Sequence, residues 1–190
     1  MSGLRVTPLP TEQAQMFWDG GSDAHGMKPE RHISDGAGVP CRHCLSSVAA
    51  GEPYLVLAYS PFTELQPYAE VGPIFLHAEP CAAYADREAI PEFFLNGEAR
   101  IVRGYDRDDR IIYGTGKVVG GSDIAAYAGD LLNDPTTAYV HVRSSSNNCF
   151  SFRIDRAGPE DQTPLTPTKD RFSLRSGISA VMAPGPPIPD

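Results

Sequence analysis

The sequence predicts an α+β fold, in which one domain consists mainly of antiparallel strands with a few short helices. Short apolar segments with strand-like patterns recur along the chain and are separated by turn residues. These segments do not alternate with long helical patterns, as they would in a parallel βαβ sheet. After residue 156 the composition changes, and Pro, Gly, Ser and Thr dominate. We therefore expect one domain over residues 1–156 and a mostly disordered tail over residues 157–190.

The first 40 residues predict one short helix between irregular segments. Residues 1–10 have an extended pattern, and Thr11 is a candidate N-cap. The helix that it would start covers residues 12–18. Residues 19–40 contain several Gly and Pro residues and show little periodicity, which predicts a long loop.

The middle of the chain predicts strands. Residues 53–59 are largely apolar, which is typical of a strand buried on both faces. Residues 74–77 predict a second, shorter strand, and residues 80–88 a helical turn or two. Residues 98–106 and 109–119 predict a hairpin, because a run of charged turn residues separates two strand-like segments.

The last part of the domain predicts one helix and a second hairpin. A candidate N-cap at Ser122 or Asp123 starts a helix that ends at about Leu132. Residues 138–143 and 149–155 have strand patterns, and the polar residues between them predict the hairpin loop.

Composition and charge exclude several classes of protein. The 190-residue chain has a formal net charge of −8 and a pI of about 5.0, which argues against nucleic-acid binding because that requires a basic face. No apolar run is long enough to span a membrane, and the start of the chain has no secretory signal. We therefore expect a cytoplasmic protein, and disulfides are rare in that compartment.

Two closely spaced pairs of Cys and His residues predict a metal site. Cys41 and Cys44 form a Cys-x2-Cys pair, and His77 and Cys81 form a second pair with three residues between them. Each pair would bind one edge of a tetrahedral ion, and the intervening strand would bring the pairs together. Thiolate and imidazole ligands favour zinc over magnesium or calcium. His43 lies inside the first pair and is not expected to be a ligand.

Two other interpretations fit the same residues. Free cysteines are often small buried core residues, and His77 would then be a hydrogen-bonded histidine at a strand end. A Cys-x2-Cys pair is also typical of a redox dithiol or a disulfide. If a metal is bound, four protein ligands indicate a structural site, whereas three ligands and a water molecule indicate a catalytic site.

Alternation along the last predicted hairpin places polar side chains on one face. If the hairpin loop has five residues, Arg143 pairs with Cys149 and His141 pairs with Ser151. These four side chains then lie together on one face of the sheet. The alternation along an earlier strand places Arg103 on a face where it could join them.

The polar face allows two interpretations. An antiparallel sheet commonly has one face in solvent, and the polar residues would then only be solvated. Alternatively, Arg103 and Arg143 bind a carboxylate or phosphate. Cys149 would then act as a nucleophile, which His141 and the nearby arginines activate.

Several motifs occur along the chain in an order that matches a known family. They are Pro40-Cys41-Arg42-His43-Cys44-Leu45, the Gly51-Glu52 turn, Tyr59-Ser60-Pro61-Phe62, residues 67–77, Tyr139-Val140-His141-Val142-Arg143 and Asn148-Cys149-Phe150. With these motifs, roughly residues 30–156 resemble domain-of-unknown-function family 1203. The resemblance implies a single compact domain of a bacterial protein, and it implies no reaction, because none is assigned to the family.

These observations together predict a binding domain with a structural zinc site. The partner that the domain binds is an unknown small molecule or protein. The alternative is an enzyme that uses an open metal site, or that uses Cys149 and His141 on an anionic substrate held by Arg103 and Arg143. Membranes and nucleic acids are not expected among the partners.

Overall fold

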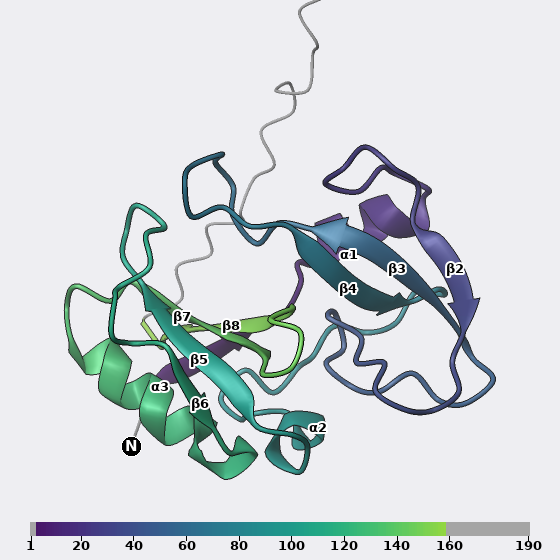
Figure 1. The fold of residues 1–190 in the computed structure, drawn as a ribbon. Helices are drawn as coiled ribbons and strands as arrows, with labels where there is room; N and C mark the ends of the chain where they lie inside the picture. Colours follow the sequence, from purple (N-terminus) through teal and green to yellow (C-terminus); the bar gives the residue numbers. More distant parts are fainter. Residues whose placement is uncertain (1–2, 159–190) are drawn as a thin grey trace, which may run out of the picture. The chain divides into compact units, whose positions relative to one another are not determined.

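Eight strands form two antiparallel sheets in this computed structural model, which describes residues 3–158 of the chain (Figure 1). The strands are β1 Leu4–Thr7, β2 Glu30–Ile33, β3 Pro53–Tyr59, β4 Gly72–His77, β5 Arg100–Tyr105, β6 Lys117–Val119, β7 Tyr139–Ser144 and β8 Phe150–Arg156. The helices are α1 Thr11–Trp18, α2 Glu92–Leu95 and α3 Ile124–Asn133, and a 3-10 turn, Gly121–Asp123, precedes α3. The predicted α+β class, with mainly antiparallel strands and a few short helices, is confirmed.

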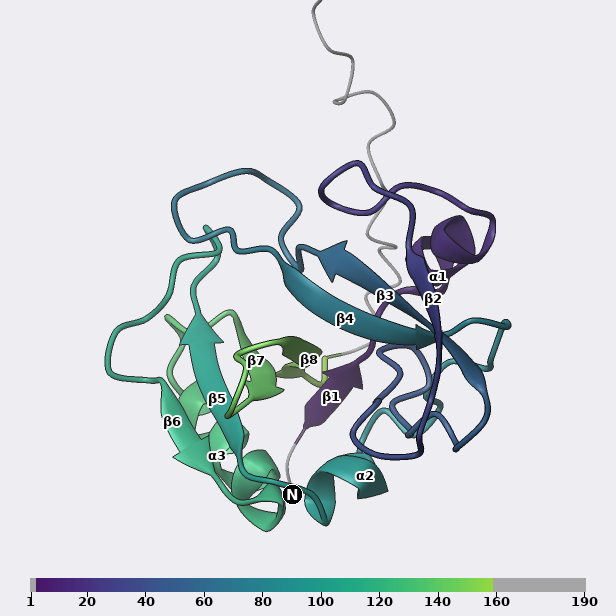
Figure 2. The same ribbon diagram turned by 45° about the vertical axis from the view of Figure 1, so that its right-hand side comes forward.

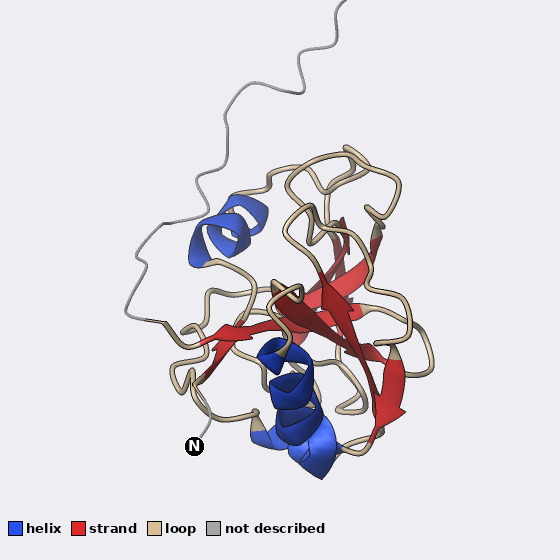
Figure 3. Ribbon diagram, turned by 90° about the vertical axis from the view of Figure 1, so that its left-hand side faces the viewer, coloured by secondary structure: helices blue, strands red, loops and turns tan. Residues whose placement is uncertain are grey.

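The larger sheet has five strands in the order β1-β8-β7-β5-β6. The strand nearest the start of the chain pairs with the last strand, so that Val6 lies opposite Ile154. Helix α3 packs on one face of this sheet (Figure 3). Its buried residues, Ile124, Ala128 and Leu132, recur every four positions and therefore form one apolar stripe.

The smaller sheet has three strands in the order β2-β3-β4. Leu55 and Leu57 of β3 alternate with partly exposed neighbours, so only one face of the strand is buried. That face packs against Ala14 and Phe17 of α1 to form a second apolar core. Strand β4 lies next to β8 of the larger sheet, which is where the two sheets meet (Figure 2).

Several local predictions are wrong for identifiable reasons. The predicted loop over residues 19–40 contains β2, whose four exposed residues make an edge strand without an apolar pattern. Residues 80–88 are not helical, because the Tyr84 N–H donates to the carbonyl of His43 instead of a local partner. The predicted two-sided burial of residues 53–59 is also wrong, since only one face of β3 is buried.

The helix near the start begins at Thr11, and its N-cap position is Pro10, with no side-chain cap. The helix predicted to end near Leu132 is confirmed as α3, which ends at Asn133. Helix α2 was not predicted; it is only one turn long and has little periodicity to detect.

The register of the last hairpin differs from the prediction. His141 pairs with Arg153, Val142 with Phe152 and Arg143 with Phe150, and a bulge lies between Val142 and Arg143. The predicted pairs of Arg143 with Cys149 and His141 with Ser151 are therefore wrong, because the loop is longer and the bulge shifts one residue. The earlier hairpin is present, but β6 is short and only residues 117–119 pair with β5.

The polar face of the larger sheet is also not a solvated surface. The segment between β3 and β4 covers it, with the Phe62 ring centroid 5.6 Å from that of Tyr105 and 5.5 Å from that of His141. Tyr139, His141 and Arg143 are consequently buried. The interpretation of this face as a wet sheet surface is therefore wrong.

Two predictions concern features at the limits of the structure. The predicted disordered tail over residues 157–190 lies outside the described residues, apart from residues 157 and 158. Within residues 3–158, no helix has both the length and the apolar character that crossing a bilayer requires.

Close packing between α2 and the turn before α3 provides a test of the fold. A Cβ atom at Gly121 would overlap the carbonyl oxygens of Leu95 and Phe94, which are backbone atoms and cannot move aside. We expect Gly121→Ala to lower the free energy of unfolding by about 2 kcal/mol, as overpacking does elsewhere. Gly129→Ala is the matched control, because a Cβ atom there meets nothing and adds helix propensity worth about 0.5–1 kcal/mol. Urea unfolding measures both, and equal midpoints for the two variants would contradict this packing.

Candidate metal centre

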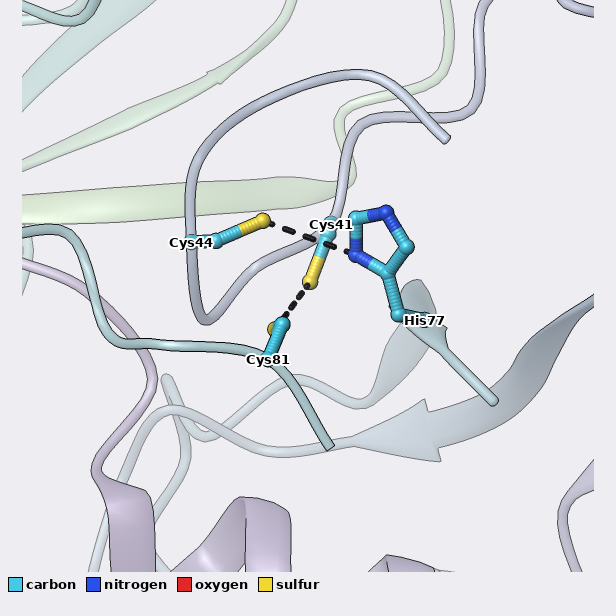
Figure 4. Close-up of side chains that lie close together, drawn as sticks. All are labelled: Cys41, Cys44, His77 and Cys81. Carbon is cyan, nitrogen blue, oxygen red and sulfur yellow. Dashed lines mark hydrogen bonds between the residues drawn. The ribbon is translucent and has the colours of Figure 1, made fainter. Parts of the chain in front are cut away.

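The structure brings four potential metal ligands together at one edge of the smaller sheet. The ligating atoms of Cys41, Cys44, His77 and Cys81 all lie within 4.8 Å of one another. Figure 4 shows the four side chains gathered together, with contacts between Cys41 and Cys81 and between Cys44 and His77. The cluster could hold a metal ion.

A tight turn over residues 40–47 places the first two thiols. The Cys41 N–H donates to the carbonyl of Ser46, over 2.9 Å, and the Leu45 N–H donates to the carbonyl of Cys41, over 3.0 Å. Leu45 adopts a left-handed backbone conformation with φ of 57°, which closes the turn and leaves its side chain buried. Cys41 and Cys44 are therefore presented from one rigid loop.

The second pair follows strand β4. His77 is its last residue, and Cys81 lies in the segment that leaves the sheet. The Trp18 indole N–H donates to the carbonyl of His77 over 2.9 Å, so helix α1 anchors the end of the strand. A parallel bridge between Cys41 and Phe75 brings the turn beside β4.

The distances match those of a tetrahedral metal site. Cys41 Sγ lies 3.8 Å from Cys81 Sγ, and Cys44 Sγ lies 3.5 Å from His77 Nδ1. Bond lengths of about 2.3 Å to sulfur and about 2.0 Å to nitrogen around a tetrahedral zinc ion imply edges of about 3.8 Å and 3.5 Å. Both distances fit such an ion, and all four ligating atoms lie within 4.8 Å of one another.

The electrostatics of the three thiols also favour a cation. The Cys44 and Cys81 thiols donate to the Cys41 sulfur and lower the pKa of Cys41 to about 3. The pKa of Cys81 is strongly raised, because its thiol is held by the sulfur of Cys41 and next by that of Cys44. If all three sulfurs were thiolates they would repel one another, and a divalent ion between them would remove this repulsion.

His43, which was not expected to be a metal ligand, contacts the cluster without being one of its four residues. His43 Nδ1 lies 3.4 Å from Cys81 Sγ, and His43 Nε2 lies 3.0 Å from the hydroxyl of Thr11. Burial lowers the pKa of His43, so the ring is neutral and one nitrogen accepts while the other donates. We assign Nδ1 as the donor to the Cys81 sulfur and Nε2 as the acceptor from the Thr11 hydroxyl. A carboxylate oxygen of Glu52 lies 3.8 Å from His77 Nε2.

The two arginines predicted to bind an anion instead bind a carboxylate of the protein itself. Glu70, from the segment between β3 and β4, hydrogen-bonds Arg103 and lies 2.8 Å from Arg143 Nη2. Arg143 Nη1 also donates to Glu70 over 3.2 Å and to the carbonyl of Asn148 over 2.8 Å. This internal carboxylate is more than 30 residues from either arginine, and no local pattern marks it.

His141 lies in an aromatic environment rather than beside a nucleophile. The ring centroid of Tyr105 is 4.6 Å from that of His141, and that of Phe150 is 4.9 Å away. Burial, and next the positive charges of Arg143 and Arg153, hold the pKa of His141 well below its usual range. The ring is therefore neutral in the folded protein.

Cys149 is separate from both groups. Its thiol donates to the carbonyl of Asn147 over 3.6 Å, and it does not belong to the Cys/His cluster. Among residues 3–158, no hydrogen bond joins Cys149 to His141. The structure therefore provides no hydrogen-bonded nucleophile and base at these positions.

Comparison with known proteins places the chain in a family. A family model described as "Protein of unknown function (DUF1203)" matches residues 38–156, which is more than half of the chain. The chain therefore belongs to this family, as the motifs predicted. No curated protein matches the sequence. No solved structure matches the fold.

The shared carboxylate provides a test of the buried ion pairs. Glu70→Gln leaves Arg143, whose side chain is only 3% exposed, without a carboxylate partner. We expect the free energy of unfolding to fall by about 3 kcal/mol, as when one partner of a buried pair is removed. Glu79→Gln is the control, since its ion pair with Arg31 is exposed and should be worth less than about 1 kcal/mol. Similar urea midpoints for the two variants would show that Glu70 does not neutralise buried charge.

The buried histidine predicts a specific pH dependence of stability. Below about pH 6.5 the unfolded chain binds a proton at His141 and the folded protein does not, so this contribution to stability is lost as the pH falls. Between pH 7 and pH 5 the loss should be about 2 kcal/mol. Urea unfolding of wild type and His141→Phe across this range measures it, because other titrating groups are common to both. Parallel pH profiles would contradict a neutral His141.

Proposed function

We propose that this DUF1203 protein is a binding domain built around a structural zinc ion. The observation that carries the proposal is the convergence of four protein ligands, three sulfurs and one nitrogen, with all ligating atoms within 4.8 Å. A site with four protein ligands has no position for a water molecule or a substrate, so its ion supports structure rather than catalysis.

Zinc is the ion that the donor set fits best. Thiolate and imidazole donors favour zinc, whereas calcium and magnesium prefer oxygen ligands and higher coordination numbers. The edge lengths of 3.8 Å and 3.5 Å fit tetrahedral zinc, a common geometry for structural sites. Cys41 is fully buried, which also suits a closed site.

The ion would hold loop segments that have little other support. It would join the turn over residues 40–47 to the end of β4 and to the irregular segment after it. Residues 78–91 contain no regular helix or strand, so a covalent-like link at Cys81 would fix their start. The ligand pairs are also separated by 32 residues of chain between Cys44 and His77, so a crosslink between them would reduce the conformational entropy of the unfolded chain.

The metal content of purified protein tests this proposal. We expect elemental analysis to find one zinc ion per chain in protein that has never been exposed to a chelator. Cys81→Ser should lose most of this zinc and melt at a lower temperature, because metal binding contributes on the order of 10 kcal/mol to the folding of small zinc sites. Cys149→Ser is the matched control, since Cys149 lies outside the cluster and its loss should leave the zinc content unchanged.

Two results would contradict the proposal. The first is clearly substoichiometric zinc in the wild-type protein. The second is equal zinc content in Cys81→Ser and wild type. A thiol titration before and after mild oxidant distinguishes the redox interpretation, because a zinc site loses metal on oxidation whereas a dithiol without metal only loses two thiols.

A further inference from the structure

A pocket that is separate from the Cys/His cluster is lined by two buried arginines. Its volume is about 550 Å³, and it lies where the turn over residues 40–47, strand β4 and helix α2 approach β7 and β8. Arg42 and Arg100 both line it. Arg103 and Arg143, which were predicted to bind an anion, both pair with Glu70, whereas Arg42 and Arg100 have no such close carboxylate partner among the described residues.

Within residues 3–158, Arg100 has almost no polar partner for its side chain. Its side chain is 8% exposed, and Nε has no hydrogen-bond partner among the described residues. The nearest carboxylate, that of Glu98, is 4.0 Å from Nη1 and belongs to a side chain that is 75% exposed. The guanidinium lies 5.2 Å from the ring centroid of Phe94, which orients it without satisfying its hydrogen-bond donors. A buried cation in this state is costly unless a ligand pairs with it.

Arg42 adds a second positive charge to the same pocket. Its Nε donates to the carbonyl of Phe150 over 2.6 Å, and Nη1 donates to the carbonyl of Pro40. These bonds hold the side chain in one orientation, with its guanidinium 5.5 Å from the ring centroid of Phe75. No carboxylate within residues 3–158 forms an ion pair with it.

The remaining walls suit a small organic anion. Ser151 is 2% exposed, and its side chain lines the pocket. Phe75 and Phe94 supply apolar surface beside the two arginines. Ligand pockets commonly combine apolar walls with a few convergent polar groups in this way, and their volumes are similar.

We propose that this pocket binds a small organic molecule with a carboxylate or phosphate group. The anionic group would pair with Arg100 and Arg42 and accept from Ser151, while the apolar part packs on Phe75 and Phe94. Charge-assisted bonds from guanidinium groups are the strong ones in anion recognition. The proposal goes beyond the zinc site, because none of the four proposed metal ligands lines the pocket.

Calorimetric titration with simple aromatic probes tests the site in the full-length, zinc-loaded protein. The probes are phenyl phosphate and benzoate, with phenol as the neutral control. We expect saturable binding of at least one anion and none of phenol. Arg100→Met should weaken anion binding at least about tenfold, the loss expected for one charge-assisted hydrogen bond. Because Arg100 has no close polar partner among the described residues, this variant should not melt below the wild type.

Glu98→Gln is the matched control for Arg100→Met. It removes the nearest competing carboxylate, so anion binding should be unchanged or stronger. No saturable binding of either anion to wild type at millimolar concentration, or equal binding by Arg100→Met, would overturn the proposal. Zinc is measured in the same preparations. If the zinc content is low but anion binding still depends on Arg100, the proposed metal site is contradicted and the proposed anion site is supported.

Discussion

Arg42 is the residue at which the two sheets are tied together. Its N–H donates to the carbonyl of Phe75 in β4, and its carbonyl accepts from the N–H of Leu9. Its guanidinium crosses to β8, where it donates to the carbonyl of Phe150 over 2.6 Å. A buried charge requires such hydrogen bonds, because removing it from water is otherwise unfavourable. The residues on either side of Arg42 belong to the cluster turn, so the proposed zinc ion and the sheet junction depend on the same few residues.

The segment between β3 and β4 covers the polar face of the larger sheet and supplies a partner for its charges. Phe62 covers the aromatic part of that face, and Glu70 forms ion pairs with both Arg103 and Arg143. A sheet face that carries two arginines and a histidine is buried only because one loop supplies both an apolar cover and a carboxylate. A buried ion network of this kind adds little net stability against an apolar alternative, but it strongly disfavours arrangements that leave a charge unpaired.

The sequence was most informative where the signal was local. The alternation in residues 139–143 and the apolar segment at residues 53–59 report on neighbours in the chain, and each predicted a strand that is confirmed. The Cys-x2-Cys spacing is also local, and both of its cysteines lie in the cluster that could hold a metal ion. Register and long-range partners were not predictable in this way. The bulge after Val142 leaves no mark in the composition, and Glu70 looks like any loop carboxylate until the fold places it beside Arg143. Arg100 was missed for the same reason, since an arginine at the start of a strand gives no sign that it is buried without a partner.

The order of the ligands along the chain also has a consequence for biosynthesis. Strands β2 to β4 and all four residues of the cluster precede residue 82, so this half of the domain is complete early as the chain leaves the ribosome. The larger sheet must wait, because Leu4 of β1 pairs with Arg156 of β8. Contacts between the two ends of a domain form slowly, and an unpaired strand is exposed to other chains until they do. If the nascent chain binds the metal, strands β2 to β4 and the cluster would fold early, and the later strands would then assemble onto them.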